Sequence, residues 1–133
     1  MVRTVLSATL QGLQVKFVNV EADVSNGLPM FHLVGYLSSE VKEAGERVRS
    51  AIRNSDFVLA PKKIVVNLSP ANFKKNGSHY DLPILVGLLQ AVGLIGALKD
   101  SCAFIGELSL EGKIRAVPGV LPMALNTLSS SFK

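Results

Sequence analysis

The run Ile64-Val65-Val66-Asn67-Leu68 is short, β-branched and almost wholly apolar. A strand with one wet face alternates apolar and polar residues, whereas a strand covered on both faces has a continuous apolar run. We therefore predict a central strand with both faces buried. The sequence on either side of it must supply the neighbouring strands and the covering helices.

Three extended runs precede this strand, near residues 4–10, 13–24 and 30–34. They are rich in Val, Leu, Thr and Phe, and they are separated by Gly12 and the turn signal Ser25-Asn26-Gly27. Within residues 13–24, apolar and polar residues mostly alternate, which is typical of a sheet with one wet face. We expect the three runs to form a meander on a half-buried sheet.

A helix is predicted from Ser38 or Ser39 to about Ser55. A hydroxyl at its start can accept hydrogen bonds from free backbone N–H groups, and Glu40 lies favourably in the positive first turn. Small and apolar residues recur at spacings of three and four on one face, namely Val41, Ala44, Val48, Ala51, Ile52 and Ser55. This face is expected to pack on the sheet.

The opposite face of this helix is charged and carries Lys42, Glu43, Glu46, Arg47, Arg49 and Arg53. Glu43 and Arg47 are four residues apart and can pair with each other. Arg49 and Arg53 are like charges at the same spacing, so they need solvent or an anionic neighbour. A solvated helix surface and a contact with an anionic partner both explain this face.

The most apolar stretch, residues 82–98, is predicted to be a buried helix. Asp81 can cap its start, and Pro83 is tolerated in its first turn. The stretch also contains Gln90 and three glycines, and a membrane span needs ~20 apolar residues. We therefore expect no contact with a membrane.

A tight hairpin is predicted near the end of the chain, because residues 103–110 and 113–117 flank Glu111-Gly112. Together these elements predict an α/β (α+β) fold with a mixed sheet and packed helices. A chain of 133 residues is expected to form a single domain over residues 1–133. Its final residues lack a capping signal and a partner strand, so we expect the chain to be a fragment of a longer one.

The composition limits the class of protein. Apolar residues make up 48% of the sequence and charged residues 18%, which excludes an intrinsically disordered chain. The net charge of +4 is compatible with a polyanionic partner without demonstrating one. A single cysteine, Cys102, cannot form an internal disulfide, and no charged segment followed by a long apolar stretch opens the chain. We expect a cytoplasmic protein.

The sequence offers little for a cofactor or a metal ion. A phosphate-binding loop ends in Gly-Lys-Ser or Gly-Lys-Thr before a helix, whereas Lys75-Asn76-Gly77-Ser78 has the right residue types in the wrong order. His32, His79 and Cys102 have no spacing typical of a metal site. We expect no cofactor, no metal and no ATP hydrolysis in this fragment.

Nucleophilic catalysis is the alternative to a non-catalytic domain. Ser78 and His79 lie in a glycine-containing loop just before a helix, where an exposed side chain could be activated. Adjacent side chains usually point apart, so their adjacency does not make a catalytic dyad. Ser78 is thus a candidate nucleophile in a domain for which we expect no catalytic residue.

Five segments resemble the ComM/YifB family of magnesium-chelatase-related AAA+ ATPases. They are Val24-Ser25-Asn26-Gly27-Leu28-Pro29, residues 43–52, residues 64–71, Asp81-Leu82-Pro83-Ile84 and residues 104–122. The segments cover nearly the whole chain in the order found in the family. The resemblance implies an N-terminal Lon-protease-like (ChlI-type) domain, with the fold of the second domain of a small-subunit ribosomal protein. It also implies a following AAA+ module that binds ATP and Mg²⁺.

The same resemblance implies a homo-oligomeric ring ATPase that acts as a DNA helicase in branch migration during natural transformation. Within it, this domain would be a non-catalytic module for assembly and DNA contact. The candidate nucleic-acid-binding residues are Lys62, Lys63, Lys74, Lys75, Arg47, Arg49 and Arg53. A module for oligomerisation without DNA contact is an alternative. No porphyrin or magnesium site is expected in this domain.

The Lon-type protease chemistry is expected to be lost. Active Lon proteases carry the nucleophile in a Lys-Asp-Gly-Pro-Ser-Ala-Gly run, and alignment of that run with residues 75–81 places His79 at the nucleophile position and Ser78 one residue early. Alignment of the Lon strand motif from Gly106 onward places the catalytic lysine at Leu121, which cannot act as a base. An ATP-dependent serine peptidase with a rearranged nucleophile at Ser78 is the enzymatic alternative.

Overall fold

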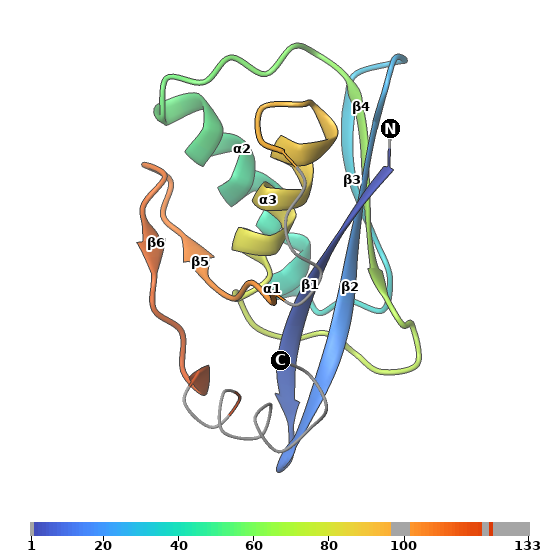
Figure 1. Ribbon diagram of the computed structural model, residues 1–133, viewed down its shortest axis with the longest axis vertical. Coiled ribbons are helices and arrows are strands. Elements are labelled where there is room, and N and C mark those ends of the chain that lie inside the picture. Colours follow the sequence, from blue (N-terminus) through green and yellow to red (C-terminus); the bar gives the residue numbers. More distant parts are fainter. Residues whose placement is uncertain (1, 97–101, 121–122, 124–133) are drawn as a thin grey trace.

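The computed structural model describes residues 2–96, 102–120 and 123. Figure 1 shows a twisted sheet on one side, helices packed against it and a short hairpin beyond the helices. The elements in chain order are β1 (Val2–Gln11), β2 (Gln14–Ser25), β3 (Met30–Val34), α1 (Ser39–Lys42), α2 (Ala44–Asn54), β4 (Lys63–Ser69), α3 (Asp81–Ala91), β5 (Glu107–Leu108) and β6 (Ile114–Arg115). The predicted mixed α/β class and the three early strands are confirmed.

The four-stranded sheet has the order β1-β2-β4-β3. β1 and β2 form an antiparallel hairpin around Gly12, whose φ of +64° lies in the left-handed region that favours glycine. β4 pairs antiparallel with β2 and parallel with β3. The predicted meander is therefore wrong, because β4 lies between β2 and β3. Parallel strands need a long crossover, and α1 and α2 provide it between β3 and β4.

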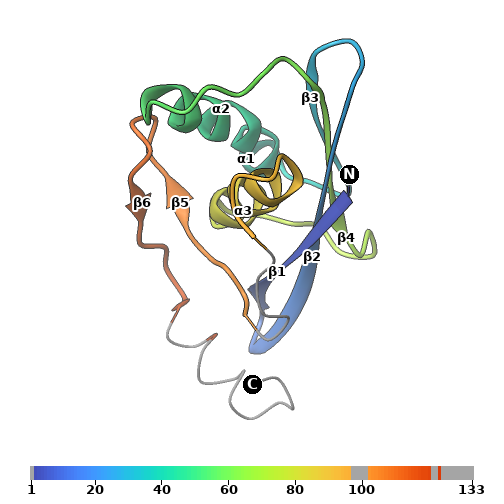
Figure 2. The same cartoon turned by 45° about the horizontal axis from the view of Figure 1, so that its top comes forward.

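The central position predicted for β4 is confirmed, but only one of its faces is covered. Ile64, Val66 and Leu68 are buried toward the helices, whereas Val65 and Asn67 on the other face are half-buried. Figure 2 shows all three helices on the same side of the sheet. The apolar run misled the prediction because Val65 is apolar although it lies on the less covered face, and burial alternates through it along the strand.

The helix predicted from Ser38 is present in two pieces, α1 and α2, which meet at Glu43. The Ser38 hydroxyl accepts a hydrogen bond from the Val41 N–H at 3.3 Å, so the predicted N-cap is confirmed. The predicted inner face is also confirmed at five positions, since the buried residues of the two helices include Val41, Ala44, Val48, Ala51 and Ile52. Ser55 is exposed.

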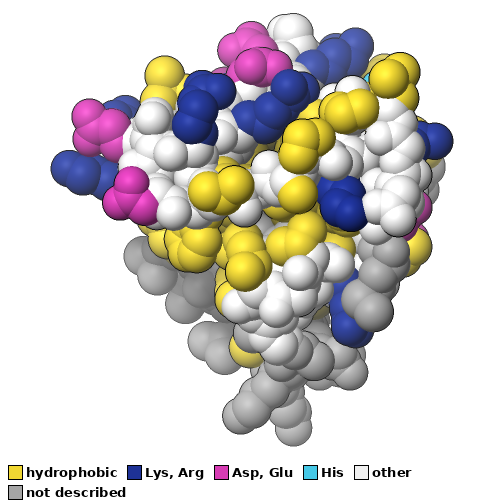
Figure 3. All heavy atoms as spheres, turned by 90° about the horizontal axis from the view of Figure 1, so that it is seen from above, with side chains coloured by type: hydrophobic (Ala, Val, Ile, Leu, Met, Phe, Trp, Pro, Cys, Tyr) yellow, Lys and Arg dark blue, Asp and Glu magenta, His cyan; other side chains and the backbone are white. Residues whose placement is uncertain are grey.

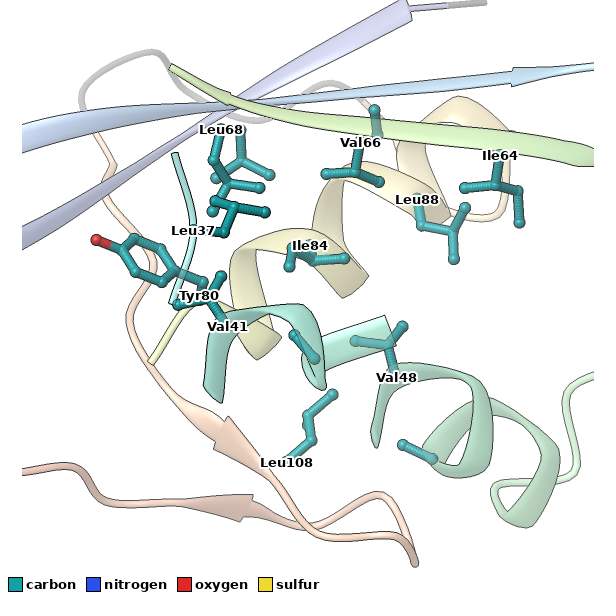
Figure 4. Close-up of a cluster of buried hydrophobic side chains, with 14 of the residues drawn as sticks. Leu37, Val41, Val48, Ile64, Val66, Leu68, Tyr80, Ile84, Leu88 and Leu108 are labelled. Carbon is teal, nitrogen blue, oxygen red and sulfur yellow. The ribbon is translucent and has the colours of Figure 1, made fainter. Parts of the chain in front are cut away.

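The hydrophobic core fills the space between the sheet and the helices. Figure 4 shows side chains from the inner face of β4, from α1, α2 and α3, and from β5 meeting in one cluster. Leu68, Ile84 and Leu88 are completely buried, and each such side chain contributes about 1.5–3 kcal/mol when removed from water. This cluster fixes the position of α3, on whose N-terminal end the candidate site depends.

The predicted buried helix is confirmed as α3, although it ends at Ala91. Gly93 follows with a φ of +81°, which terminates the helix in a conformation that other residues rarely adopt. Seven residues of α3 are buried, so water reaches few of its positions. No helix within the described parts of the chain is long and apolar enough to span a membrane.

The predicted hairpin is present as β5 and β6, with strands shorter than expected. The Ser109 N–H donates to the Lys113 carbonyl at 2.9 Å, and Gly112 takes a φ of +93° in the turn. The Asn54 side chain donates to the Leu110 carbonyl at 2.8 Å, which ties the hairpin to the end of α2.

Candidate functional site

Lys75 lies in the loop between β4 and α3, the segment that aligns with the Lon nucleophile loop. Its side chain is completely buried. The ammonium group donates to the carbonyl oxygens of Pro70 and, at 3.0 Å, of Phe73. It also lies 4.7 Å from the centroid of the Phe73 ring, in a cation–π contact. Burial lowers the pKa of Lys75.

The backbone of Lys75 holds this loop against the segment that leads into α1. Its N–H donates to the Tyr36 carbonyl, and its carbonyl accepts from the Ser38 N–H, both at 2.9 Å. Lys75 was predicted to contact nucleic acid, but its ammonium group is buried and hydrogen-bonded to carbonyl oxygens, which argues against that contact.

Arg47 projects from α2 toward the first residue of α3. Its Nε and Nη2 atoms donate to the two carboxylate oxygens of Asp81 at 2.7 Å and 3.0 Å, and Nη2 also donates to the Glu40 carbonyl at 3.1 Å. The hydrogen bond to Asp81 raises the pKa of Arg47. The predicted partner Glu43 is 3.9 Å away and largely exposed, so it is the weaker partner.

Asp81 is completely buried and also accepts a hydrogen bond from the Leu108 N–H at 3.1 Å. Burial raises the pKa of Asp81, while Arg47 and the Leu108 amide act in the opposite direction. The prediction that Asp81 caps α3 is wrong, because its carboxylate bonds α2 and β5 and makes no cap hydrogen bond. The guanidinium of Arg47 makes its hydrogen bonds inside the molecule, which argues against its predicted DNA contact.

Ser78 and His79 precede α3. Ser78 is half-buried, and its hydroxyl makes no hydrogen bond to an amine or imidazole of the described residues. His79, at the aligned nucleophile position, is 9% exposed, and burial lowers the pKa of its imidazole to about 4. Its Nε2 atom is buried without a partner in the part of the chain that the structure describes. Leu121 lies outside the described residues, so the predicted loss of the Ser/Lys pair stays a prediction.

Tyr80 continues this buried polar segment. Its ring centroid lies 4.1 Å from that of His79, and Figure 4 shows its hydroxyl pointing away from the centre of the core. Burial raises the pKa of Tyr80 to about 12, against a smaller opposing effect of the nearby Thr9. Among the described residues, none makes a hydrogen bond to the buried Tyr80 hydroxyl. Near neutral pH, the His79 and Tyr80 side chains are therefore both uncharged.

The structure brings together only part of the predicted cationic set. Arg49 and Lys62 line a hollow of about 220 Å³, and Arg49 and Arg53 line a neighbouring hollow of about 410 Å³. Lys63 follows at the start of β4, whereas Lys74 is exposed in the loop beyond its other end. Figure 3 looks down on the end of the molecule where α2 leads into β4, and shows Lys and Arg side chains among hydrophobic ones.

The cations at this end have only weak partners. Arg49 pairs with the exposed Glu46 at 3.6 Å, and Arg53 donates to the Ser50 hydroxyl at 3.3 Å. Lys62 donates to the Asn26 side chain at 2.6 Å. An exposed ion pair such as that of Arg49 with Glu46 contributes about 0–1 kcal/mol, and the partners of Arg53 and Lys62 carry no charge. An incoming anion can therefore displace these partners at small cost.

Exposed apolar side chains surround these cations, a feature that the sequence analysis missed. Val58 is 93% exposed, Phe57 52%, Leu28 83% and Met30 40%. The available signal was the apolar run Phe57-Val58-Leu59-Ala60-Pro61, which no predicted helix or strand had used. A contiguous exposed apolar patch beside charged groups is typical of an interaction surface. The described residues contain no group of three or more potential metal ligands.

Comparison with known proteins gives consistent matches. A family model described as subunit ChlI of Mg-chelatase matches residues 20–133. Competence protein ComM of Haemophilus influenzae is 45% identical over 91% of this chain, and YifB of Escherichia coli is 43% identical over 92%. A protein of Mycobacterium tuberculosis is 37% identical over 90% of the chain. The chain spans about a quarter of each relative, since the match covers 24% of their lengths.

Proposed function

This chain belongs to the family of subunit ChlI of Mg-chelatase, and on that premise we propose that it is a non-catalytic module for assembly and DNA contact in a cytoplasmic AAA+ ATPase. The complete protein would be a homo-oligomeric ring that drives branch migration of DNA during competence. The Haemophilus influenzae relative is named a competence protein, which supports that role. In the complete protein, ATP and Mg²⁺ would bind to an AAA+ module outside these 133 residues.

The observation that carries the DNA contact is the cationic end formed by Arg49, Arg53, Lys62 and Lys63. Arg49 and Arg53 are exposed on one helix, and Lys62 shares a hollow with Arg49. Guanidinium and ammonium groups that neutralise phosphates release counterions, so such binding is independent of sequence and weakens with salt. We leave the remaining predicted cations out of the proposed surface, because Lys75 and Arg47 are bonded internally and Lys74 lies beyond the other end of β4.

The geometry of the loop before α3 supports a non-catalytic module. A Ser/Lys mechanism needs an accessible hydroxyl beside an amine. Here the imidazole of His79 takes the aligned nucleophile position and is buried, and the ammonium of Lys75 is held by backbone carbonyls. The loop is thus organised by internal hydrogen bonds.

Fluorescence anisotropy titration with single-stranded and branched DNA tests the proposed contact in the full-length protein. The triple variant Arg49→Glu, Arg53→Glu, Lys62→Glu is compared with a control of equal charge change at exposed sites elsewhere, Lys16→Glu, Lys74→Glu, Lys113→Glu. Each lost phosphate contact lowers the salt slope by about 0.7 for single strands. The first variant should lose about two units of slope and the control should lose little. Equal losses in both, or no salt-dependent binding at all, would refute the DNA contact.

A further inference from the structure

β3 is an edge strand whose outer side is open. It is the last strand of the sheet and pairs only with β4, in parallel. The Met30 N–H donates to the Lys62 carbonyl at 3.2 Å, so Met30, His32 and Val34 direct their backbone groups toward β4. The N–H and C=O groups of Phe31 and Leu33 alternate with these and point outward. Within the described chain no partner bonds them.

An apolar hollow lies beside this free edge. Met30 and Phe31 of β3 form part of its lining, and Leu59 and Pro61 of the segment before β4 form another part. Leu59 also lines the larger hollow, together with Phe57 and Val58. The two hollows therefore share a wall and make one surface beside the edge of β3, which we call the β3 groove.

The rim of the β3 groove is cationic. Arg49 lines both hollows and lies over the Phe31 ring, 5.3 Å from its centroid. Arg53 lines one hollow and Lys62 the other. The floor offers mainly aliphatic side chains with a single strongly exposed aromatic residue, Phe57. Nucleobases bind on aromatic platforms, so this floor is better matched to the aliphatic side chains of a peptide.

From this geometry we infer that the β3 groove binds an extended acidic peptide segment of another polypeptide, which adds a strand to β3. Backbone groups of the segment would bond the N–H and C=O groups of Phe31 and Leu33. Its alternate apolar side chains would enter the hollows, and its carboxylates would pair with Arg49 and Arg53. Strand addition of this kind takes affinity from main-chain hydrogen bonds and specificity from pockets for alternate side chains. The inference does not depend on the DNA role, although both involve Arg49, Arg53 and Lys62.

The first test uses a fluorescein-labelled nine-residue peptide in which Val and Glu alternate, titrated against this 133-residue chain by anisotropy. A peptide with Lys in place of Glu is the charge control. The Glu peptide should bind at least tenfold more tightly. Arg49→Glu should weaken it about tenfold or more, whereas Lys16→Glu, the same charge change at an exposed site in β2, should change it less than twofold. Equal affinity for the two peptides, or equal effects of the two variants, would overturn the proposal.

The second test addresses the edge itself by amide hydrogen exchange. The peptide should slow exchange at Phe31 and Leu33 at least tenfold, with little change at His32, whose backbone already pairs with β4. N-methylation removes a backbone N–H donor. Methylation of every second peptide residue should therefore abolish binding when it falls on the residues that face β3, and should leave binding intact when it falls on the other residues. Unprotected Phe31 and Leu33 amides in the bound state would overturn strand addition. Protection by an oligothymidine in place of the peptide would overturn it in favour of nucleic acid, and protection in a ligand-free dimer would overturn it in favour of a second copy.

Discussion

The guanidinium of Arg47 donates two hydrogen bonds, of 2.7 Å and 3.0 Å, to the carboxylate of Asp81 and thereby joins α2 to α3. Asp81 is completely buried and Arg47 is 19% exposed at its side chain, so the pair is largely shielded from water. The Leu108 N–H adds β5 to the same carboxylate. This pair sets the position of the loop before α3, in which Ser78, His79 and Tyr80 lie.

Loss of Arg47 should destabilise the protein severely. Arg47→Met leaves the buried Asp81 carboxylate without its cation, and breaking a buried pair in this way costs about 3–5 kcal/mol. Urea unfolding followed by circular dichroism gives the free energy of unfolding. The control Arg53→Met, on the same helix but exposed, should lie within about 0.5 kcal/mol of the wild type. A double variant with Asp81→Leu should be less destabilised than the sum of the single changes, and strict additivity would contradict the pairing.

The stability of the fold should fall in mild acid because of His79. Its pKa is about 4 in the folded protein, below the ordinary 6.5, so between these values the unfolded chain binds more protons. The stability that His79 contributes in its neutral form is fully present above the ordinary pKa of 6.5 and is lost as the pH falls toward 4. It amounts to about 3 kcal/mol between pH 7 and pH 4. Urea midpoints over this range should drop less in His79→Leu than in the wild type.

The comparison with the other histidine separates this effect from general acid denaturation. His32 is exposed on β3, so His32→Gln should retain the acid sensitivity of the wild type. If His79→Leu and the wild type lost stability in parallel, the imidazole of His79 would not be buried in its neutral form.

The ammonium of Lys75 should matter for stability and not for DNA contact. Lys75→Met keeps a long unbranched side chain but leaves the carbonyls of Pro70 and Phe73 without their donor. An unsatisfied buried polar group costs about 1–3 kcal/mol. Thermal unfolding should show this loss, and Lys74→Met, one residue away and exposed, should not. A loss of DNA affinity in folded Lys75→Met without a change in stability would contradict the internal role.

A serine-directed covalent probe should leave Ser78 unlabelled. The hydroxyl is half-buried, and within the described residues no base is hydrogen-bonded to it. Mass spectrometry of the full-length protein with ATP present should show no adduct, and Ser78→Ala should retain all ATP-dependent activity. An adduct that disappears in Ser78→Ala would instead establish the peptidase alternative.

Local sequence pattern was sufficient for most elements of the fold. The alternation in residues 13–24, the Ser38 cap and the spacing of Val41, Ala44 and Val48 each predicted the structure that is observed. These features depend on residues close together in the chain, where backbone geometry and side-chain periodicity decide the conformation. The order of the strands was not accessible in this way, because insertion of β4 between β2 and β3 depends on contacts distant in sequence.

The same distinction separates the side chains at the candidate site. The charge and residue type of Arg47, Lys75 and Arg49 can be read from the chain, and all three were candidate nucleic-acid-binding residues. Packing alone decided that Arg47 meets Asp81, 34 positions away, that Lys75 turns inward to carbonyl oxygens, and that Arg49 stays at the surface. A cation is stable either in water or beside a buried acceptor, and only the folded arrangement determines which of these each side chain reaches.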